Sequence, residues 1–345
     1  MPTNVIGTYD TAEMLEAINA TPRPRTFLLE RCFGGNVRTF DTKYVLLDWR
    51  RGGRVMAPFV NRKIGGKLVE KLSTATRRYE PPMIAPRAVF RGDEAFERGP
   101  GEVIGGDASP AERMAALIAD EFASHDMLIT RRIEWMVAKM LTTGTIPIVG
   151  EGVVDEIDLD FTQTEALGGA DLWTASTSDP LGDIEDWSME LIQAAGVTPD
   201  TAILGKTAAK AFKSHEKVQN YLNLRNVMPG QMNPRELPNG VKYIGSIEAV
   251  DYFTYPEWYI DDTTGVETPM IPDAACVLFP SSARNIGAKM LYGAHWEAKS
   301  RTAVKGERIP RQWVEEGPNV EFAELVSYPV PLMPDVDSWK VATVV

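Results

Sequence analysis

Apolar or ring-bearing residues recur at steps of three and four between positions 110 and 142, the longest regular pattern in the chain. This spacing places them on one face of an α-helix; they are Ile118, Phe122, His125, Ile129, Ile133, Met136 and Met140. Ser109, Pro110 and Glu112 supply a cap, a first-turn proline and a capping-box glutamate. Gly144 can end the helix. At ~1.5 Å per residue the helix would be roughly 50 Å long, and its predicted core-facing residues are Ile118, Phe122, Ile129, Ile133 and Met136.

The chain before this helix has short apolar runs broken by turn residues. Runs at 44–47 and 55–57 are separated by glycine pairs at 52–53 and 65–66, and prolines follow at 81, 82 and 86. This is the pattern of strands and turns, but the stretch is too polar for a core of its own, so we predict a projecting hairpin. Residues 1–37 are expected to form an arm, with a short helix from about 10 to 20 and extended chain at the prolines that follow.

The chain after the long helix combines strands and helices. Residues 145–161 are predicted strands, because three apolar residues alternate there with Asp158 and Asp160. Residues 162–180 are a predicted loop. Residues 181–300 form a predicted α/β subdomain, with helices ending near 196 and 222 and strands at 201–204, 241–255 and 275–279. Closing strands are expected at 325–330 and 339–345. An α+β protein of two or three subdomains fits this order and the length of 345 residues.

Composition narrows the class of protein. The net charge of −12 argues against a protein whose main task is gripping nucleic acid, but it does not exclude a container around nucleic acid. Cys32 and Cys276 are far apart in sequence, which favours two free, packed thiols in a reducing compartment. The sequence has no apolar run of membrane-spanning length and no signal peptide in residues 1–30. We therefore expect a protein that folds in a cytoplasm and has no membrane partner.

Gly205-Lys206-Thr207 resembles the end of a phosphate-binding loop. That motif needs another glycine five residues before the glycine–lysine pair, so that the backbone can wrap the phosphates. The position holds Asp200, an anion where an anion should bind. We interpret the segment as a strand–turn–helix junction with Gly205 at the turn.

Other candidate chemistry is equally weak. The acidic run Asp155, Glu156, Asp158 and Asp160 lacks the glycine and the final glutamate of an EF-hand, which favours a solvated strand face. The three histidines are scattered, and no HExxH, GxSxG or GxGxxG motif is present. We expect no catalytic residues, no cofactor and no metal.

Five segments carry a resemblance that covers nearly the whole chain. They are Ser109-Pro110-Ala111-Glu112-Arg113; Asp179-Pro180-Leu181-Gly182-Asp183-Ile184-Glu185 with Ala195-Gly196-Val197; Ala211-Phe212-Lys213 with Val218; Ile271-Pro272-Asp273 through Val277-Leu278 to Ala283-Arg284; and Ile309-Pro310-Arg311-Gln312-Trp313-Val314 with Pro329-Val330-Pro331-Leu332-Met333. Their joint order and spacing resemble the tailed-bacteriophage capsid fold, and more specifically the lambda-type major capsid protein family.

The resemblance implies a division of the chain. Residues 1–38 would be the N-terminal arm, 39–92 the extended E-loop, 93–178 the peripheral domain with its spine helix at about 110–142, 179–300 the axial domain, and 301–345 strands that return to the peripheral domain. Members form hexameric and pentameric capsomers of an icosahedral shell around double-stranded DNA, which is not bound sequence-specifically. The implied partners are a scaffolding protein, a portal and a possible decoration protein. Because only about 38 residues precede the E-loop, the scaffold is expected on a separate chain, or assembly proceeds without one. The implied location is the virion, after assembly in the host cytoplasm.

Charge is distributed unevenly in a way that suggests how subunits meet. Residues 38–91 contain thirteen Lys or Arg and four acids, a balance of +9, whereas residues 151–190 hold twelve acids and no Lys or Arg. A projecting loop has little core of its own, so a basic loop resting on an acidic surface of its neighbour would be steered by complementary fields. The candidate contact residues are Arg62, Lys63, Lys67, Lys71, Arg77 and Arg78 on one side and Asp155, Glu156, Asp158 and Asp160 on the other. Alternatively, the two runs never meet, or the loop faces a scaffold or DNA.

Three alternatives to a phage head remain at this stage. One is a nucleotide-dependent enzyme on residues 179–300, which nucleotide binding would reveal. Another is a cellular nanocompartment shell protein of the same fold, which neighbouring portal and terminase genes would argue against. A tail-tube subunit is the third, but such subunits are not expected to need a helix of ~50 Å.

Overall fold

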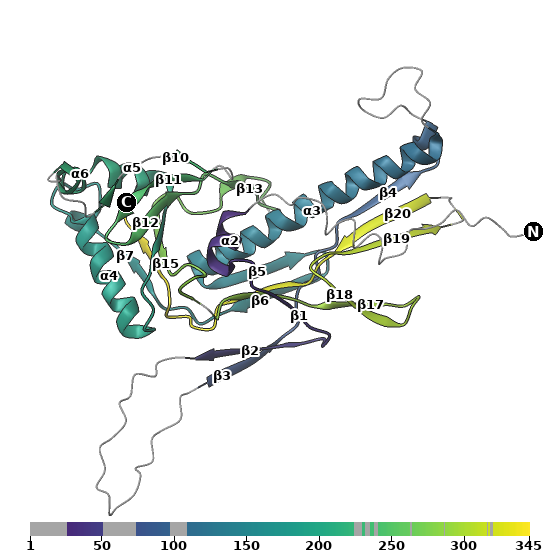
Figure 1. Ribbon diagram of the computed structural model, residues 1–345, viewed down its shortest axis with the longest axis horizontal. Helices are drawn as coiled ribbons and strands as arrows, with labels where there is room; N and C mark the ends of the chain where they lie inside the picture. The colour runs from purple at the N-terminus through teal and green to yellow at the C-terminus, as the bar shows by residue number, and fades with distance from the viewer. Residues whose placement is uncertain are drawn as a thin grey trace, which may run out of the picture.

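The computed structural model describes residues 26–50, 74–96, 109–223, 230–231, 235–237, 241–262, 264–285, 287–315, 317 and 320–345. One long helix runs beside small antiparallel sheets. A larger mixed sheet, with three helices on one face, forms one end of the molecule (Figure 1). The predicted helix at 10–20 and the strand at 55–57 lie outside the described residues.

The long helix is α3, Pro110–Thr143. Its capping box is complete, because Glu112 N–H donates to the Ser109 hydroxyl and the Glu112 carboxylate accepts from Ser109 N–H. It ends at Gly144, whose φ of 69° lies in the left-handed region and where an added Cβ would come within 2.1 Å of Phe161 Cβ. The five residues predicted to face the core are all buried: Ile118, Phe122, Ile129, Ile133 and Met136.

Small antiparallel sheets accompany α3. The three-stranded sheet β19-β20-β4 contacts it, and the hairpin β5–β6 follows it directly; the strands are β4 (Arg87–Arg91), β19 (Ile309–Glu315), β20 (Val320–Val326), β5 (Thr145–Gly150) and β6 (Val153–Asp158). Arg308, which precedes β19, binds this layer to α3. Its buried guanidinium donates to Asp126 at 2.5 Å and to Thr130 at 2.9 Å, and both of these residues are on the helix.

The larger sheet is mixed and has the order β10-β11-β12-β8-β15-β22-β7, with β9 paired to β11. Its strands are β7 (Thr164–Ala166), β8 (Thr201–Leu204), β9 (Gly230–Gln231), β10 (Arg235–Glu236), β11 (Lys242–Ile247), β12 (Val250–Thr254), β15 (Ala275–Phe279) and β22 (Lys340–Thr343). β8 and β15 are buried on both faces, so apolar residues fill successive positions rather than alternate ones.

The two faces of this sheet belong to separate hydrophobic clusters. Ile203, Val277 and Phe279 join the cluster that holds α2 (Phe27–Phe33) and α3. Their neighbours Ala202, Leu204 and Leu278 join the cluster under α4 (Pro180–Ala194), α5 (Lys206–Ser214) and α6 (Glu216–Asn223). Cys32 and Cys276 are free and buried, one in each cluster.

Shorter elements complete the described chain. β2 (Val45–Arg50) and β3 (Thr74–Tyr79) pair as a hairpin that projects from the body in Figure 1. The others are β1 (Val37–Thr39), β13 (Trp258–Ile260), β14 (Glu267–Pro269), β16 (Lys289–Tyr292), β17 (Ala294–Glu297), β18 (Thr302–Lys305), β21 (Pro329–Leu332) and the 3-10 turns η1 (Glu94–Phe96) and η2 (Gly169–Asp171). Among the described helices, none is both long and apolar enough to cross a membrane.

The predicted division into arm, E-loop, peripheral domain, axial domain and return strands stays a prediction. Near the start of the described chain, α2 buries Phe27, Leu28 and Phe33, and β1 pairs with β16. The last strand of the chain is β22. That strand enters the larger sheet between β15 and β7, where Val341 and Ala342 fill opposite clusters.

Two predictions about local structure are wrong. The predicted loop at 162–180 contains β7, a polar edge strand that exists only because β22 pairs with it in parallel. The single helical stretch predicted from 207 to about 222 is two helices. His215 separates them with extended φ and ψ of −67° and 131°, and its Nδ1 accepts from Lys217 N–H in the first turn of α6.

Candidate assembly surfaces

The Gly205-Lys206-Thr207 segment has no room for a phosphate. Gly205 caps α5, and an added Cβ would lie 2.1 Å from the Pro272 carbonyl oxygen. The N–H groups of Thr207 and Ala208, which a phosphate would need, both donate to the Asp273 carbonyl at 3.0 Å. The chain itself therefore occupies the anion position, and the segment is the strand–turn–helix junction that the sequence predicts.

Asp200 has a structural role beside this junction. Its carboxylate accepts from Ser281 N–H at 2.7 Å and from the Ser281 hydroxyl at 2.6 Å, and Arg284 lies 3.3 Å away. These contacts fasten the start of β8 to the end of β15, and they leave the carboxylate no part in binding an anion.

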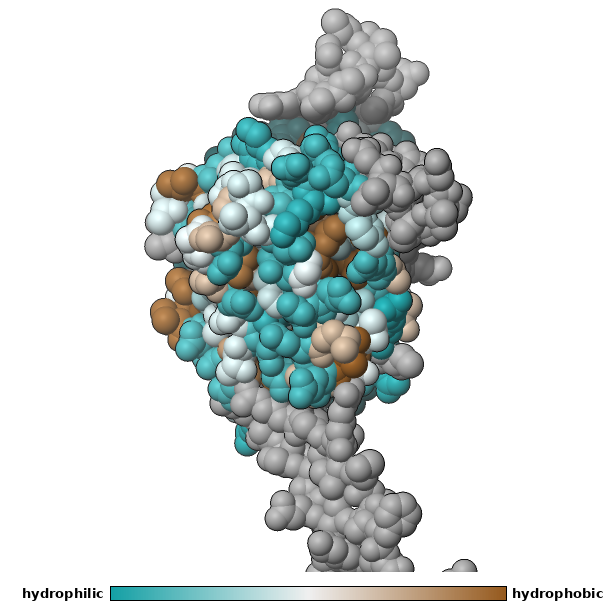
Figure 2. Space-filling model, turned by 90° about the vertical axis from the view of Figure 1, so that its left-hand side faces the viewer, coloured by the Kyte–Doolittle hydropathy of each residue, from teal (hydrophilic) through white to brown (hydrophobic). Residues whose placement is uncertain are grey.

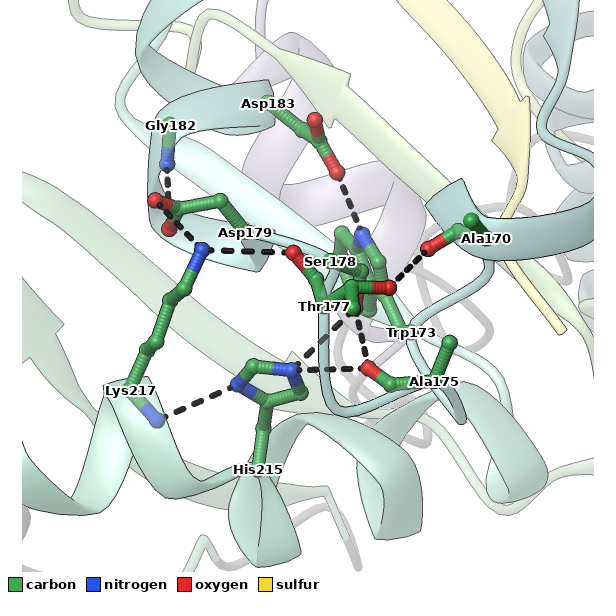
Figure 3. Close-up of polar contacts among 10 residues, drawn as sticks. All are labelled: Ala170, Trp173, Ala175, Thr177, Ser178, Asp179, Gly182, Asp183, His215 and Lys217. Carbon is green, nitrogen blue, oxygen red and sulfur yellow. Dashed lines mark hydrogen bonds and ion pairs between the residues drawn. The ribbon is translucent and has the colours of Figure 1, made fainter.

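Ser178 and His215 come close enough to suggest a catalytic pair, with Ser178 Oγ 3.1 Å from His215 Nε2 (Figure 3). However, His215 Nδ1 accepts a backbone N–H, so Nε2 carries the proton and donates to the Ala175 carbonyl at 3.2 Å. The Ser178 hydroxyl donates to the same carbonyl at 2.8 Å. A serine nucleophile needs the opposite arrangement, with an acceptor at Nε2 and a carboxylate at Nδ1.

The contacts in Figure 3 form a clamp between the loop before α4 and the start of α6. Lys217 reaches Asp179 at 3.2 Å, and Asp179 caps α4 by accepting from Gly182 N–H. Trp173 donates its indole N–H to Asp183 at 2.8 Å and stacks on Trp187. The cluster positions α4 and α6 over the sheet, and its polar groups bind one another.

The remaining histidines each contact a neighbouring side chain. Burial lowers the pKa of His125, although the nearby Glu121 opposes the shift, and Nε2 lies 3.2 Å from the Glu121 carboxylate. Burial likewise lowers the pKa of His295, whose Nδ1 bonds the Tyr328 hydroxyl at 2.9 Å. Over the described residues, no group of three or more His, Cys, Asp or Glu could hold a metal ion.

The acidic candidates lie on β6 and just after it. Asp155, Glu156 and Asp160 are exposed and Asp158 is half-buried. The tip of the β5–β6 hairpin exposes three valines, Val149, Val153 and Val154, and Val154 is 87% exposed. An apolar tip beside an acidic strand is a surface that a neighbour could cover.

The basic candidates are described only in part. Arg62, Lys63, Lys67 and Lys71 lie outside the described residues, and Arg77 pairs with Leu47 in the β2–β3 hairpin. Arg78 is exposed and stacks over the Tyr44 ring, with its guanidinium carbon 3.5 Å from the ring centre. Lys43 pairs with Glu80 at 3.2 Å.

The buried carboxylate of Glu134 was not predicted from the sequence. Glu134 on α3 accepts from Leu28 N–H at 2.8 Å, Leu29 N–H at 3.1 Å and the Tyr255 hydroxyl at 2.8 Å. Burial raises its pKa to about 7, although the three donors oppose the shift. In sequence, the only sign is that Asp126, Thr130 and Glu134 follow one another at steps of four beside the apolar stripe.

The comparisons with known proteins agree over the whole length. A family model described as phage major capsid protein E matches residues 10–344. The P21 prophage-derived major head protein of Escherichia coli O6:H1 strain CFT073 is 25% identical over 348 residues, which cover 98% of this chain and 100% of that protein. The major capsid protein of Escherichia phage N15 is 24% identical and covers 96% and 97% of the two chains.

Solved structures show the same fold. A proposed capsid protein of a prophage in E. coli CFT073 superposes with a TM-score of 0.71 at 18% identity, over 98% of this chain and 99% of that one. A phage-related protein from Bordetella bronchiseptica RB50 superposes with a TM-score of 0.56 at 12% identity, over 96% of each chain. The fold class predicted from the sequence is confirmed.

Proposed function

The chain belongs to the phage major capsid protein E family, and we propose that its copies form hexameric and pentameric capsomers that close an icosahedral head around double-stranded DNA. The protein is a major capsid protein, and its place is the shell of the virion. The match over residues 10–344 carries this conclusion, and it favours a phage head over a cellular nanocompartment. The structural role of the Gly205-Lys206-Thr207 junction argues against the nucleotide-dependent enzyme.

The proposal includes partners and a location. We infer a scaffolding protein on a separate chain, a portal and a possible decoration protein, with assembly in the host cytoplasm. The protein would act by assembling and not by turnover. Expression alone and with its neighbouring genes, followed by electron microscopy and sedimentation, tests this. Capsomers or closed particles are expected in at least one condition, and a monomer in every condition, including with its scaffold, would contradict it.

We also propose that the E-loop of one subunit rests on the β5–β6 hairpin of its neighbour. The exposure of Asp155, Glu156 and Asp160 and the +9 balance of residues 38–91 support this. Each exposed pair contributes only ~0–1 kcal/mol, but a closed shell repeats every contact many times. Screening at ~1 M salt, where the Debye length is ~3 Å, should therefore loosen the shell.

A charge reversal tests this contact. Arg77→Glu with Arg78→Glu should lower the yield of shells, and adding Asp158→Lys with Asp160→Lys should restore part of it. Lys299→Glu with Arg301→Glu is the matched control, because both residues are exposed in the turn between β17 and β18. If the Arg77 and Arg78 reversals leave assembly and its salt response unchanged, the contact is wrong and the capsid function stands.

A further inference from the structure

Helix α4 presents charge of one sign. Residues 180–194 include four acids and no Lys or Arg. Glu185, Asp186 and Glu190 are exposed beside Met189, which is 63% exposed. Glu190 is neutralised within the chain by Lys340. Glu185 and Asp186 form no ion pair with any residue in the described part of the chain.

Helix α5 presents the opposite charge. Lys206, Lys210 and Lys213 are exposed at spacings of four and three, which place them on one face, and residues 206–214 contain no acid. Among described residues, none of the three lysines has an ion-pair partner. Lys206 also stands at the first position of the helix, where the helix dipole disfavours a cation. The stability of α5 therefore does not explain Lys206, whereas Lys213 lies in the last turn, where the dipole favours a cation.

The two charged helices lie at different ends of the helical layer. α4 covers the β22 end of the sheet, where Lys340 contacts Glu190. α5 covers the β12 side, where Phe212 stacks on Tyr252 with ring centres 4.8 Å apart. α6 contacts both helices. The surface at this end of the molecule is mainly hydrophilic (Figure 2), so an interface built on it would depend on charge more than on apolar area.

The rotational symmetry of a ring would bring these two charged faces together between neighbouring subunits. In a ring of identical subunits each contact is head-to-tail, so two different surfaces of the chain must fit one another. We propose that the acidic face of α4 (Glu185, Asp186) in one subunit docks on the lysine face of α5 (Lys206, Lys210, Lys213) in the next subunit around a capsomer. This rests on the proposed function, because it requires a ring of copies. Complementary fields would then steer the association and fix its direction.

Charge reversal tests the pairing. Glu185→Lys with Asp186→Lys, or Lys210→Glu with Lys213→Glu, should lower capsomer and shell yield by roughly tenfold or more, because like charges would face each other. Combining all four changes should restore assembly. Lys299→Glu with Arg301→Glu again serves as the control, and circular dichroism of each variant checks folding. If the α4 double variant and the α5 double variant both fold and both assemble normally, the proposal is overturned.

A second measurement detects the contact directly. Particles grown from mixed nitrogen-15-labelled and unlabelled wild-type subunits are treated with a zero-length carbodiimide crosslinker and analysed by mass spectrometry. Mixed-label crosslinks that join Glu185 or Asp186 to a lysine of α5 are expected. Particles that form without such crosslinks would refute the α4–α5 contact and leave the capsid function intact, whereas subunits that never assemble would refute both.

Discussion

Glu134 allows a prediction whose sign is set by its surroundings. The side chain is only 2% exposed, and it joins three parts of the fold by accepting from Leu28 and Leu29 at the start of α2 and from Tyr255 after β12. The negative charge of Glu257 also raises the pKa of Glu134. The buried Cys32 lies near Glu134, and the pKa of its thiol is raised well above the normal value. No cation is among the causes of the shift in the Glu134 pKa.

The raised pKa fixes how stability depends on pH. Burial moves the pKa of Glu134 from 4.5 to about 7 in the folded chain. Between these values the folded state holds a proton that the unfolded state has released, so stability falls as pH rises. A shift of this size corresponds to about 3 kcal/mol. The contribution of Glu134 is therefore most favourable below pH ~4.5 and is lost as pH rises through about 7.

The Glu134→Gln variant isolates this contribution. Its amide oxygen can still accept from Leu28 and Tyr255, but its amide N–H group faces Leu29 N–H, which loses its acceptor at a cost of about 1–3 kcal/mol. We expect the variant to be less stable than wild type at pH 5, and the difference to shrink or reverse by pH 8. Urea unfolding of the unassembled subunit from pH 5 to 8 measures this.

A control distinguishes the effect of ionising Glu134 from the effect of losing one of its hydrogen bonds. Tyr255→Phe removes one donor to Glu134 without neutralising it, so it should cost about 1 kcal/mol. Its stability should still fall as pH rises, because the lost hydrogen bond opposed the raised pKa of Glu134. If Glu134→Gln and wild type differ by the same free energy from pH 5 to 8, Glu134 is ionised throughout and the reasoning fails.

Three further predictions concern single positions. Phe122→Ala should cost about 3–5 kcal/mol in urea unfolding, because the ring is buried in the core; an unchanged midpoint would contradict this. Asp126→Ala should cost about 3–5 kcal/mol, because it leaves the buried Arg308 guanidinium without its carboxylate, and Arg308→Met with Asp126→Leu should recover most of the loss. Gly205→Ala should lower the melting temperature, because its Cβ would collide with the Pro272 carbonyl. Calorimetry of the wild-type protein should detect no binding of ATP or GTP. Micromolar nucleotide affinity that is lost in Lys206→Ala would refute this.

The sequence predicts best where local chemistry determines the structure. The Ser109–Glu112 capping box, Gly144 and the spacing of the apolar residues between them place α3 within one residue of its observed end. Phe122 is buried because the same period that defines the helix also defines its core face. Each of these features depends on residues at most a few positions apart.

Contacts between distant segments were beyond prediction. Glu134 is buried by residues 106 and 121 positions away, and α3 therefore has a second, polar stripe that a search for apolar periodicity does not detect. β7 is a strand only because β22 lies beside it. Its three exposed residues carry no apolar alternation, so they resemble a loop until the partner strand is known.

The placement of charge separates mutations that unfold the subunit from those that stop it assembling. Asp126, Glu134 and Glu324 are buried, and each finds its donors within the chain; removing one leaves buried polar groups unsatisfied and destabilises the fold itself. Glu185 and Asp186 of α4 and the lysines of α5 have no such partners among the described residues, so reversing them should change the melting temperature little. A variant that melts normally but does not assemble therefore identifies a contact between subunits, and the two helices are where such variants are expected.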